Sequence, residues 1–243
     1  MTQIGIIGFG RFGKVLASIL QKGFDILAYD PEPQNPHHGV QFTELYNILE
    51  MNHIFIAVPI RQFENVVLEI VPQLKPETTL LDVCSVKMHP LEIMQNHLPD
   101  HCGYIASHPM FGPDSFRSSN KLKMMMHPVM DRFNKFEFWS QFFSGQGIQI
   151  INMSPENHDK LAARSQGVTH FLGRSLKDFG IQRTSIDTQG FRDLLDLVQQ
   201  TCNDSWELYE DLQSYNPFTK AMVEDINSVV KQNRDKLSGL DHA

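Results

Sequence analysis

Residues 5–20 read GIIGFGRFGKVLASIL, and this stretch decides the fold. It contains the pattern G-x-G-x-x-G at Gly8, Gly10 and Gly13, directly after a short apolar run and at the start of a segment with helical spacing. In such a turn the first glycine permits the tight bend, the second lets a pyrophosphate approach the backbone, and the third lets helix and strand pack closely. The stretch therefore predicts a dinucleotide-binding turn; the alternative is that its glycines serve packing alone.

An acidic residue, Asp30, follows the second apolar run, about 20 residues after the glycine turn. A carboxylate at this place accepts hydrogen bonds from the ribose hydroxyls of NAD and repels the 2′-phosphate of NADP. Arg11 lies inside the turn, where a guanidinium can assist a phosphate, so NADP stays open as the alternative to NAD. The predicted cofactor-binding residues are Gly8, Phe9, Gly10, Arg11, Phe12, Gly13, Asp30, Val58 and Pro59.

Short apolar runs alternate with helical segments along the first half of the chain, which is typical of βαβ units on a parallel sheet. Strands are predicted at 4–8, 25–30, 53–59, 79–83 and 103–107. Helices are predicted at 11–23, 42–50, 62–74 and 89–98. Two later runs, 123–130 and 147–153, are expected to extend the sheet around a helix at 133–143. The first half is thus predicted to be an α/β Rossmann-like, doubly wound sheet.

The remaining chain is predicted to be all-helical, which divides the protein into domains at 1–152 and 153–243. Ser154 is expected to cap a helix that starts at Pro155 and stops at Gly180. Further helical blocks are expected at 191–215 and 217–237.

Charge and cysteine content narrow the possible partners. The chain has 21 basic and 28 acidic residues, a net charge of −7, and no basic run, which argues against a nucleic-acid surface. Its three cysteines show no CxxC spacing and are expected to be reduced thiols, without a metal site. No signal segment or apolar stretch of about 20 residues is visible. We expect a cytoplasmic protein that binds a small-molecule substrate and no membrane.

Polar side chains follow two of the predicted strands. Ligands of doubly wound sheets bind beyond the carboxyl ends of the strands, where Ser85 and Lys87 follow one strand and Ser107 and His108 the next. Pro109 favours an extended backbone at His108. A histidine beside a nicotinamide is suited to take the proton of a hydroxyl group, and Ser85 is placed to hydrogen-bond the histidine or that hydroxyl. Position alone leaves a structural and a catalytic role for His108 equally open.

Five stretches, in the same order, resemble the prephenate/arogenate dehydrogenases of tyrosine biosynthesis. They are GFGRFG, DVCSVK, SHPMFGP, ENHDKLAARSQGVTH and IDTQGFRDLLDLVQQTCNDSWELYEDLQSYNP. The helical half is most similar to the arogenate dehydrogenases of plants. The resemblance implies an NAD(P)-dependent oxidative decarboxylation of a cyclohexadienol. Hydride leaves the carbinol carbon for the nicotinamide, and His108 takes the hydroxyl proton. Loss of CO2 then yields tyrosine from arogenate or hydroxyphenylpyruvate from prephenate.

The resemblance also implies roles for individual residues. Ser85 matches a serine that hydrogen-bonds the reacting hydroxyl and the catalytic histidine. His170 matches a substrate-facing histidine, with a core histidine as the alternative. Asp204 matches an acidic position of arogenate-preferring enzymes, where a carboxylate pairs with the substrate ammonium, so arogenate is the preferred substrate; a helix-interrupting aspartate is the equal alternative. His158 is explained by its place in a helix-capping segment.

The chain departs from the family pattern at one binding position. Many bacterial members carry an arginine shortly after the GF of the helical half, and this chain has Asp196 there. The anchor for the substrate carboxylate is therefore left open between Arg164, Gln166 and Arg192. Family members dimerise through the helical half, which is rich in apolar residues here, so a homodimer is expected.

Two other functions are compatible with parts of the sequence. A β-hydroxyacid dehydrogenase shares the domain plan but relies on a lysine in the helical half, for which Lys160 is the only approximate match. A nucleotide-sensing protein without catalysis would need only the glycine turn. The presence of Ser85, His108 and His170 together argues against the second alternative.

Overall fold

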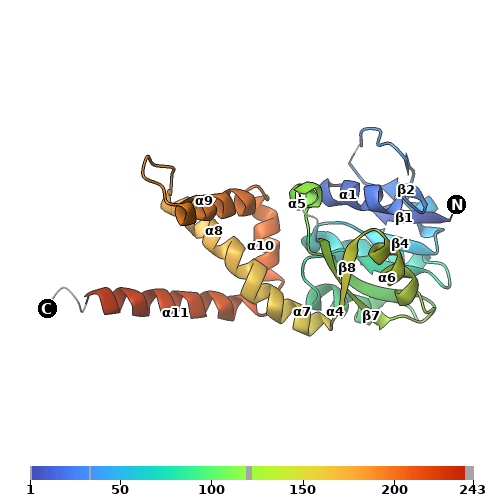
Figure 1. Ribbon diagram of the computed structural model, residues 1–243. Helices are drawn as coiled ribbons and strands as arrows, with labels where there is room; N and C mark the ends of the chain where they lie inside the picture. Colours follow the sequence, from blue (N-terminus) through green and yellow to red (C-terminus); the bar gives the residue numbers. More distant parts are fainter. Residues whose placement is uncertain (1, 33, 119–121, 239–243) are drawn as a thin grey trace. The chain divides into compact units, whose positions relative to one another are not determined.

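The structure is a computed structural model that describes residues 2–32, 34–118 and 122–238. The chain divides into two compact units, 1–158 and 159–243, which Figure 1 traces along the chain. The domain boundary that we predict from the sequence, between 152 and 153, lies a few residues before this division.

In the described part of the first unit, eight strands form one sheet. The strands are β1 (Gln3–Ile7), β2 (Asp25–Tyr29), β3 (Val40–Phe42), β4 (His53–Ile56), β5 (Thr79–Asp82), β6 (Gly103–Pro109), β7 (Leu122–Met130) and β8 (Ile148–Asn152). Their order in the sheet is β3-β2-β1-β4-β5-β6-β7-β8, and all neighbours are parallel except β6 and β7. This confirms the predicted Rossmann-like sheet. The central strands β4, β5 and β6 are buried throughout, as expected for parallel strands covered on both faces.

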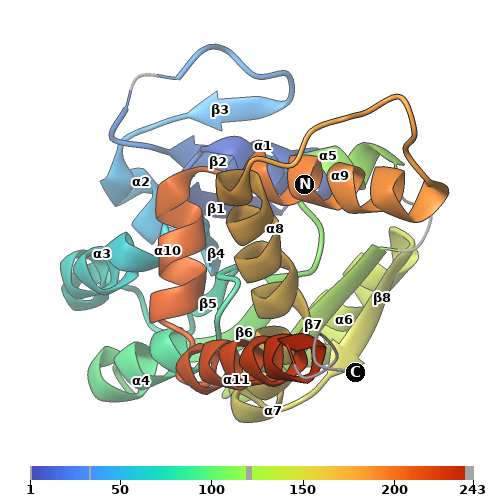
Figure 2. The same ribbon diagram turned by 90° about the vertical axis from the view of Figure 1, so that its left-hand side faces the viewer.

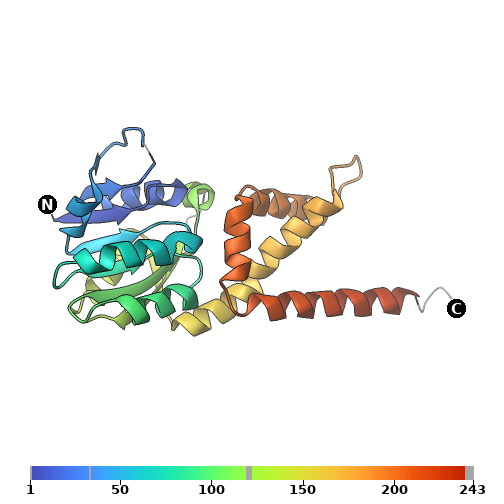
Figure 3. The ribbon, with the colours of Figure 1, turned by 180° about the vertical axis from the view of Figure 1, so that it is seen from behind.

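Helices cover both faces of this sheet. They are α1 (Arg11–Leu20), α2 (Leu45–Leu49), α3 (Phe63–Ile70), α4 (Met88–His97), α5 (Pro113–Ser118) and α6 (Phe136–Gly145). Figures 1 and 3 show α1 and α6 on one face, and α3 and α4 on the other. Trp139 of α6 is fully buried, with its ring 4.9 Å from that of Phe55 and 5.4 Å from that of Phe24. The aromatic core therefore lies on the face that α1 and α6 cover.

The second unit is helical in its described part, and the division between the units falls inside the first of the helices that follow β8. The helices are α7 (Pro155–Ala162), α8 (Val168–Phe179), α9 (Gln189–Cys202), α10 (Trp206–Ser214) and α11 (Thr219–Ser238), with a π-helical segment at Ala163–Gly167 between α7 and α8. Figure 2 shows α9 beside α8, where Gly173 lets the two helices approach closely at Thr201. The predicted cap at Ser154 and stop at Gly180, which has a φ of +85°, are confirmed.

Two predicted helices are interrupted in the structure. The helix predicted from Pro155 to its stop at Gly180 contains the π-helical segment, whose Gly167 carbonyl accepts a hydrogen bond from Gln213 Nε2 at 3.2 Å. The predicted block 191–215 is wrong as one helix, because Ser205 starts a new helix by accepting a hydrogen bond from the Leu208 N–H. β3 and α5 were not predicted. No helix among the described residues is long and apolar enough to cross a bilayer.

Candidate active site

The glycine turn has the geometry that a dinucleotide site needs. Gly8 has a φ of +93°, and a Cβ added there would lie 2.6 Å from the Ala57 carbonyl oxygen. A Cβ at Gly13 would lie 2.5 Å from the Gly8 carbonyl oxygen, so α1 packs directly on the turn. By contrast, the space beside Gly10 is open to at least 4 Å. The N-terminus of α1 therefore faces open space that suits a pyrophosphate, and the turn fits an NAD(P) cofactor.

Asp30 lies beside this turn, directly after β2. Its Oδ2 accepts a hydrogen bond from the Phe9 N–H at 2.5 Å, and its Oδ1 accepts one from the Glu32 N–H at 2.9 Å. The carboxylate therefore ties the glycine turn to the end of β2. Each carboxylate oxygen can accept more than one hydrogen bond, so both still have capacity for ribose hydroxyls.

The other predicted cofactor residues surround the turn in different ways. The Val58 side chain lies close to the Cα of Gly8, because a Cβ added there would lie 2.9 Å from Val58 Cγ1. Pro59 precedes the short 3-10 helix Ile60–Gln62. Phe12 packs toward Phe111 at a ring distance of 6.1 Å. Arg11 is exposed at the first position of α1. Phe9 is fully buried, so its ring belongs to the core and only its backbone is available to a cofactor.

His108 lies inside β6, which extends to Pro109. The ring is 5% exposed, and its Nδ1 lies 2.8 Å from the Nε2 of His158. Burial lowers the pKa of His108 well below its usual value, and the nearby His158 and Lys87 lower it further. His108 is therefore neutral at physiological pH, which is the state in which an imidazole accepts a proton.

A buried charge network holds the backbone next to His108. Asp82, at the end of β5, forms a fully buried ion pair with Lys87. Asp82 also accepts hydrogen bonds from the Tyr104 hydroxyl at 2.7 Å and the Ser107 N–H at 3.2 Å. Lys87 Nζ donates to the Ser107 carbonyl oxygen at 2.5 Å. The network therefore joins the ends of β5 and β6 immediately before the histidine.

Ser85 is half-buried in the segment between β5 and α4. In the described part of the chain, the hydrogen-bond partner of His108 Nδ1 is His158 and not Ser85. Of the two roles that the resemblance implies for Ser85, the bond to the histidine at Nδ1 is therefore taken by another residue. Contact between Ser85 and the reacting hydroxyl stays a prediction.

His158 is the residue whose importance the sequence analysis missed. Ser154 Oγ does accept the N–H of Asn157 at 3.3 Å, so this segment caps a helix as we expect. Capping does not account for the His158 side chain, which is 3% exposed and points at His108. The two histidines are 50 positions apart, and no local pattern in the sequence links them.

In the second unit, two predicted substrate residues lie close together. His170 is on the first turn of α8, and its buried Nδ1 has no hydrogen-bond partner among the described residues. Burial lowers the pKa of His170, the Asp204 carboxylate raises it in part, and Arg174 lowers it. His170 and Asp204 are therefore near enough to interact electrostatically.

Arg174, which the sequence analysis did not single out, holds the turn that carries Asp204. Its Nη2 donates to the carbonyl oxygens of Asp204 at 2.5 Å and Ser205 at 3.3 Å. The guanidinium also lies over the rings of Trp206 and Tyr209, at 5.8 and 5.5 Å from their centroids. The spacing of His170 and Arg174, four residues apart on one helix, was the available signal that they share a face.

The three candidates for the carboxylate anchor have different surroundings. Arg164 pairs with Asp225 at 2.9 Å, and both side chains are exposed. The Arg192 guanidinium donates to the Asp187 carbonyl oxygen at 2.7 Å, at the start of its own helix. Gln166 is half-buried in the π-helical segment. The assignment of the anchor among them stays a prediction.

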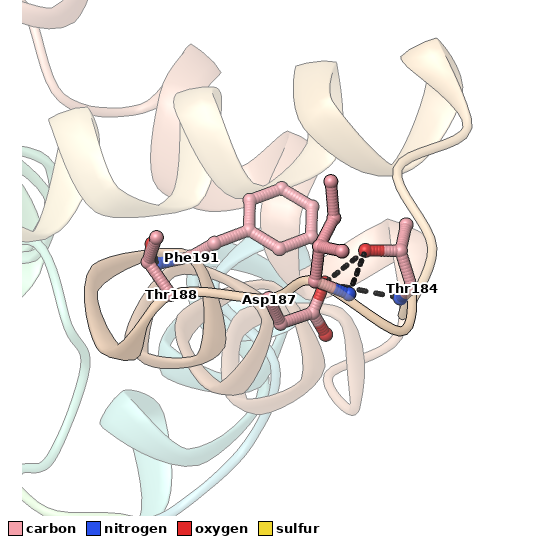
Figure 4. Close-up of a pocket in the computed structure, with 5 residues that line it drawn as sticks. Thr184, Asp187, Thr188 and Phe191 are labelled. Atoms are coloured by element: carbon pink, nitrogen blue, oxygen red, sulfur yellow. Dashed lines mark hydrogen bonds between the residues drawn. The ribbon is translucent and has the colours of Figure 1, made fainter.

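A hollow in the loop before α9 contains none of the predicted site residues. It is lined by Thr184, Ile186, Asp187, Thr188 and Phe191, and Figure 4 shows the hydrogen bonds within it. Asp187 Oδ1 accepts from the Thr184 hydroxyl at 2.7 Å and from the Thr184 N–H at 3.0 Å. The Thr184 hydroxyl is the main reason that the pKa of Asp187 is lowered. The carboxylate therefore stabilises the loop itself.

The chain as a whole is similar to known dehydrogenases. Residues 21–124 match the family model "Prephenate dehydrogenase, nucleotide-binding domain", and residues 175–243 match "TYRAAT1-like, C-terminal domain". The chain is 34% identical to arogenate dehydrogenase 1, chloroplastic, and 31% identical to arogenate dehydrogenase 2, chloroplastic, both from Arabidopsis thaliana. Each alignment covers 99% of this chain, which spans 40% of the first relative and 71% of the second.

Solved structures show the same fold. Prephenate dehydrogenase from A. aeolicus, in complex with hydroxyphenyl propionate and NAD+, superposes with a TM-score of 0.77 at 17% identity, covering 98% of this chain and 91% of that one. Synechocystis arogenate dehydrogenase superposes with a TM-score of 0.73 at 18% identity, covering 99% of this chain and 93% of that one.

Proposed function

Because the chain belongs to the arogenate/prephenate dehydrogenase family, we propose that it catalyses the NAD(P)-dependent oxidative decarboxylation of a cyclohexadienol in tyrosine biosynthesis. The observation that carries this proposal is His108, a buried and neutral histidine on β6 of a sheet with an open glycine turn. A proton acceptor held in this state suits the removal of a proton from a substrate hydroxyl.

The proposed reaction assigns each step to residues of the chain. The glycine turn would bind the pyrophosphate of the cofactor. The Asp30 carboxylate would accept hydrogen bonds from the ribose hydroxyls of the cofactor. A bound nicotinamide would supply the acceptor for the hydride of the carbinol carbon. His108 accepts the hydroxyl proton at Nε2, which leaves a dienone. The bond between the ring and its carboxylate then breaks, CO2 leaves, and the electron pair enters the ring, which becomes aromatic.

An assay of the purified chain tests this function. Arogenate and prephenate are each supplied with NAD, the reduced cofactor is followed by absorbance, and the aromatic product is identified by chromatography. We expect turnover with at least one of the two. A chain that oxidises a β-hydroxyacid but neither cyclohexadienol would support the β-hydroxyacid dehydrogenase alternative. A chain that binds NAD without oxidising any of these compounds would support a nucleotide-sensing role.

We propose NAD as the preferred cofactor, because the Asp30 carboxylate would repel the 2′-phosphate of NADP. Asp30→Asn removes this charge but keeps one oxygen to accept the Phe9 N–H. The substitution should raise the efficiency with NADP relative to NAD by about tenfold or more. The same change at the other end of β2, Asp25→Asn, is the matched control. A wild-type preference for NADP would remove Asp30 from this role.

We propose arogenate as the preferred substrate, with Asp204 pairing with its ammonium group. Asp204→Asn keeps the backbone carbonyl that Arg174 binds, so the turn is preserved while the charge is lost. The ratio of kcat/KM for arogenate to that for prephenate should fall by about tenfold or more, as expected when a charge-assisted hydrogen bond is lost. Asp193→Asn changes the same charge at an exposed position of α9 and should leave the ratio unchanged. A wild-type enzyme that uses both substrates equally would contradict this role.

We also propose that the chain forms a homodimer through its helical half. Several large apolar side chains of this unit are exposed, among them Leu161, Phe179, Trp206, Val229, Val230 and Leu237. Apolar surface of this extent is typical of an interface. Light scattering at micromolar concentration should give twice the mass of one chain, and Val230→Asp should shift the protein toward the monomer. A wild-type monomer would contradict the proposal.

The cytoplasmic location stays a prediction, and two of the plant relatives are named as chloroplastic.

A further inference from the structure

The contact between His108 and His158 is a hydrogen bond within the first unit of the chain. Their nitrogens, Nδ1 and Nε2, are 2.8 Å apart, which is within the normal range for a hydrogen bond. The rings meet edge to face, with an interplanar angle of 79° and centroids 5.0 Å apart. Both rings are nearly inaccessible to solvent, so water does not replace either partner.

A hydrogen bond between two neutral imidazoles contains one proton, so one ring donates and the other accepts. A base that takes the substrate proton at Nε2 must have that nitrogen unprotonated, and its own proton is then on Nδ1. His108 Nδ1–H would therefore donate to His158 Nε2. His158 in turn carries its proton on Nδ1. The tautomers of the two rings are thus coupled.

The groups around His108 explain why a hydrogen-bond acceptor is useful here. Lys87 is on the β5 side and disfavours a charged His108, while Asp82 is occupied by Lys87, Tyr104 and Ser107. An acceptor at Nδ1 orients the ring, while burial and the nearby Lys87 keep it unprotonated before the reaction. When the ring takes the substrate proton, the Nδ1–H bond to His158 becomes charge-assisted and stronger.

We propose that His158 is a positioning residue, which fixes His108 in the Nδ1–H tautomer and directs its Nε2 lone pair to the substrate. The catalytic consequence rests on the proposed function, whereas the tautomer itself does not. The inference comes from the buried histidine pair.

Two substitutions at His158 separate hydrogen bonding from packing. In His158→Gln, the amide oxygen can reach the position of the imidazole Nε2 and accept the same hydrogen bond. His158→Leu has a side chain of comparable bulk without an acceptor. We expect the leucine variant to lose about tenfold or more in kcat with little change in KM. The glutamine variant should retain most of the activity.

The tautomer is measured directly by NMR of protein labelled with 15N in histidine, with the His108 signals identified from a His108→Asn variant. The wild type and the glutamine variant should show the proton of His108 on Nδ1, and the leucine variant should lose this preference. Binding of NAD, followed by fluorescence, confirms that each variant is folded.

Two results would overturn the proposal. The first is a leucine variant with the turnover and the His108 tautomer of the wild type. The second is an equal loss of turnover in both variants with the tautomer unchanged, which would show that the ring of His158 is needed only for packing. If the wild type oxidises no cyclohexadienol, the proposed function fails, while the NMR measurement still decides whether His158 sets the tautomer.

Discussion

Replacing His108 with asparagine or alanine should lower turnover by about a hundredfold or more, the scale expected for loss of a general base. The asparagine side chain is polar but does not take a proton at neutral pH, so the hydroxyl proton of the substrate would have no acceptor. The glycine turn lies between β1 and α1, away from β6, and is untouched by the change. The affinity for NAD, measured by fluorescence titration, should therefore remain close to that of the wild type.

The control for this experiment is a histidine on the neighbouring strand. His127 of β7 hydrogen-bonds Asn152 Oδ1 at 3.0 Å, is less buried than His108 and belongs to no proposed step. His127→Asn should leave turnover unchanged. Normal turnover in His108→Asn would remove the histidine from the reaction. A large loss of NAD affinity in the same variant would show that the substitution disturbs the sheet.

The pH dependence provides a second readout for His108. Its pKa lies well below the ordinary value of 6.5 because the ring is buried. Between these two pKa values the folded protein therefore binds fewer protons than the unfolded chain, so the stability falls as the pH drops from 6.5 toward the lowered pKa. The neutral, active form of the folded protein is lost only near the lowered pKa. The profile of kcat/KM should stay level through pH 6.5 and decline only under more acidic conditions. A decline centred near 6.5 would contradict a buried neutral base.

The fold of the first unit was largely predictable, because its signals are local. The glycine turn and the apolar runs identify the strands from β1 to β6, apart from β3, and the helices between them. β3 has only three residues, which is too short for a period of two to stand out. The break between α9 and α10 occurs where Ser205 caps the start of α10. The apolar residues on both sides have helical spacing, so the sequence pattern alone predicts one continuous helix. Gly167 of the π-helical segment packs closely against α11, a contact that sequence periodicity does not report.

The residues of the site could be predicted only where they belong to a recognisable sequence motif. The glycine turn, Asp30 and His108 stand in recognisable stretches of sequence, whereas His158 acts through a contact across 50 residues. Asp82 offered a partial signal, since a carboxylate in the apolar stretch TLLDV must have a partner if that strand is buried. The sequence places Lys87 near the strand end, but its pairing with Asp82 depends on how the segment after β5 folds.

Replacing Lys87 with methionine should destabilise the first unit by about 3 kcal/mol, the lower end of the range for breaking a buried ion pair. Methionine fills much of the volume of the lysine stem, so the cost arises mainly from the charge left on Asp82. The hydrogen bonds from Tyr104 and Ser107 to that carboxylate remain, which is why we expect the lower value. The Ser107 carbonyl also loses its donor, so the backbone before His108 should shift and turnover should fall.

The same substitution at an exposed pair is the matched control. Lys75 contacts Glu50 at 2.6 Å, with side chains 41% and 58% exposed, and Lys75→Met should cost less than about 1 kcal/mol. The two tryptophans allow the first unit to be followed alone, because Trp139 is buried there and Trp206 belongs to the second unit. In a Trp206→Phe background, urea unfolding monitored by fluorescence reports on Trp139. Equal unfolding free energies for the two methionine variants would show that Asp82 does not depend on Lys87, and that the network does not hold His108 in place.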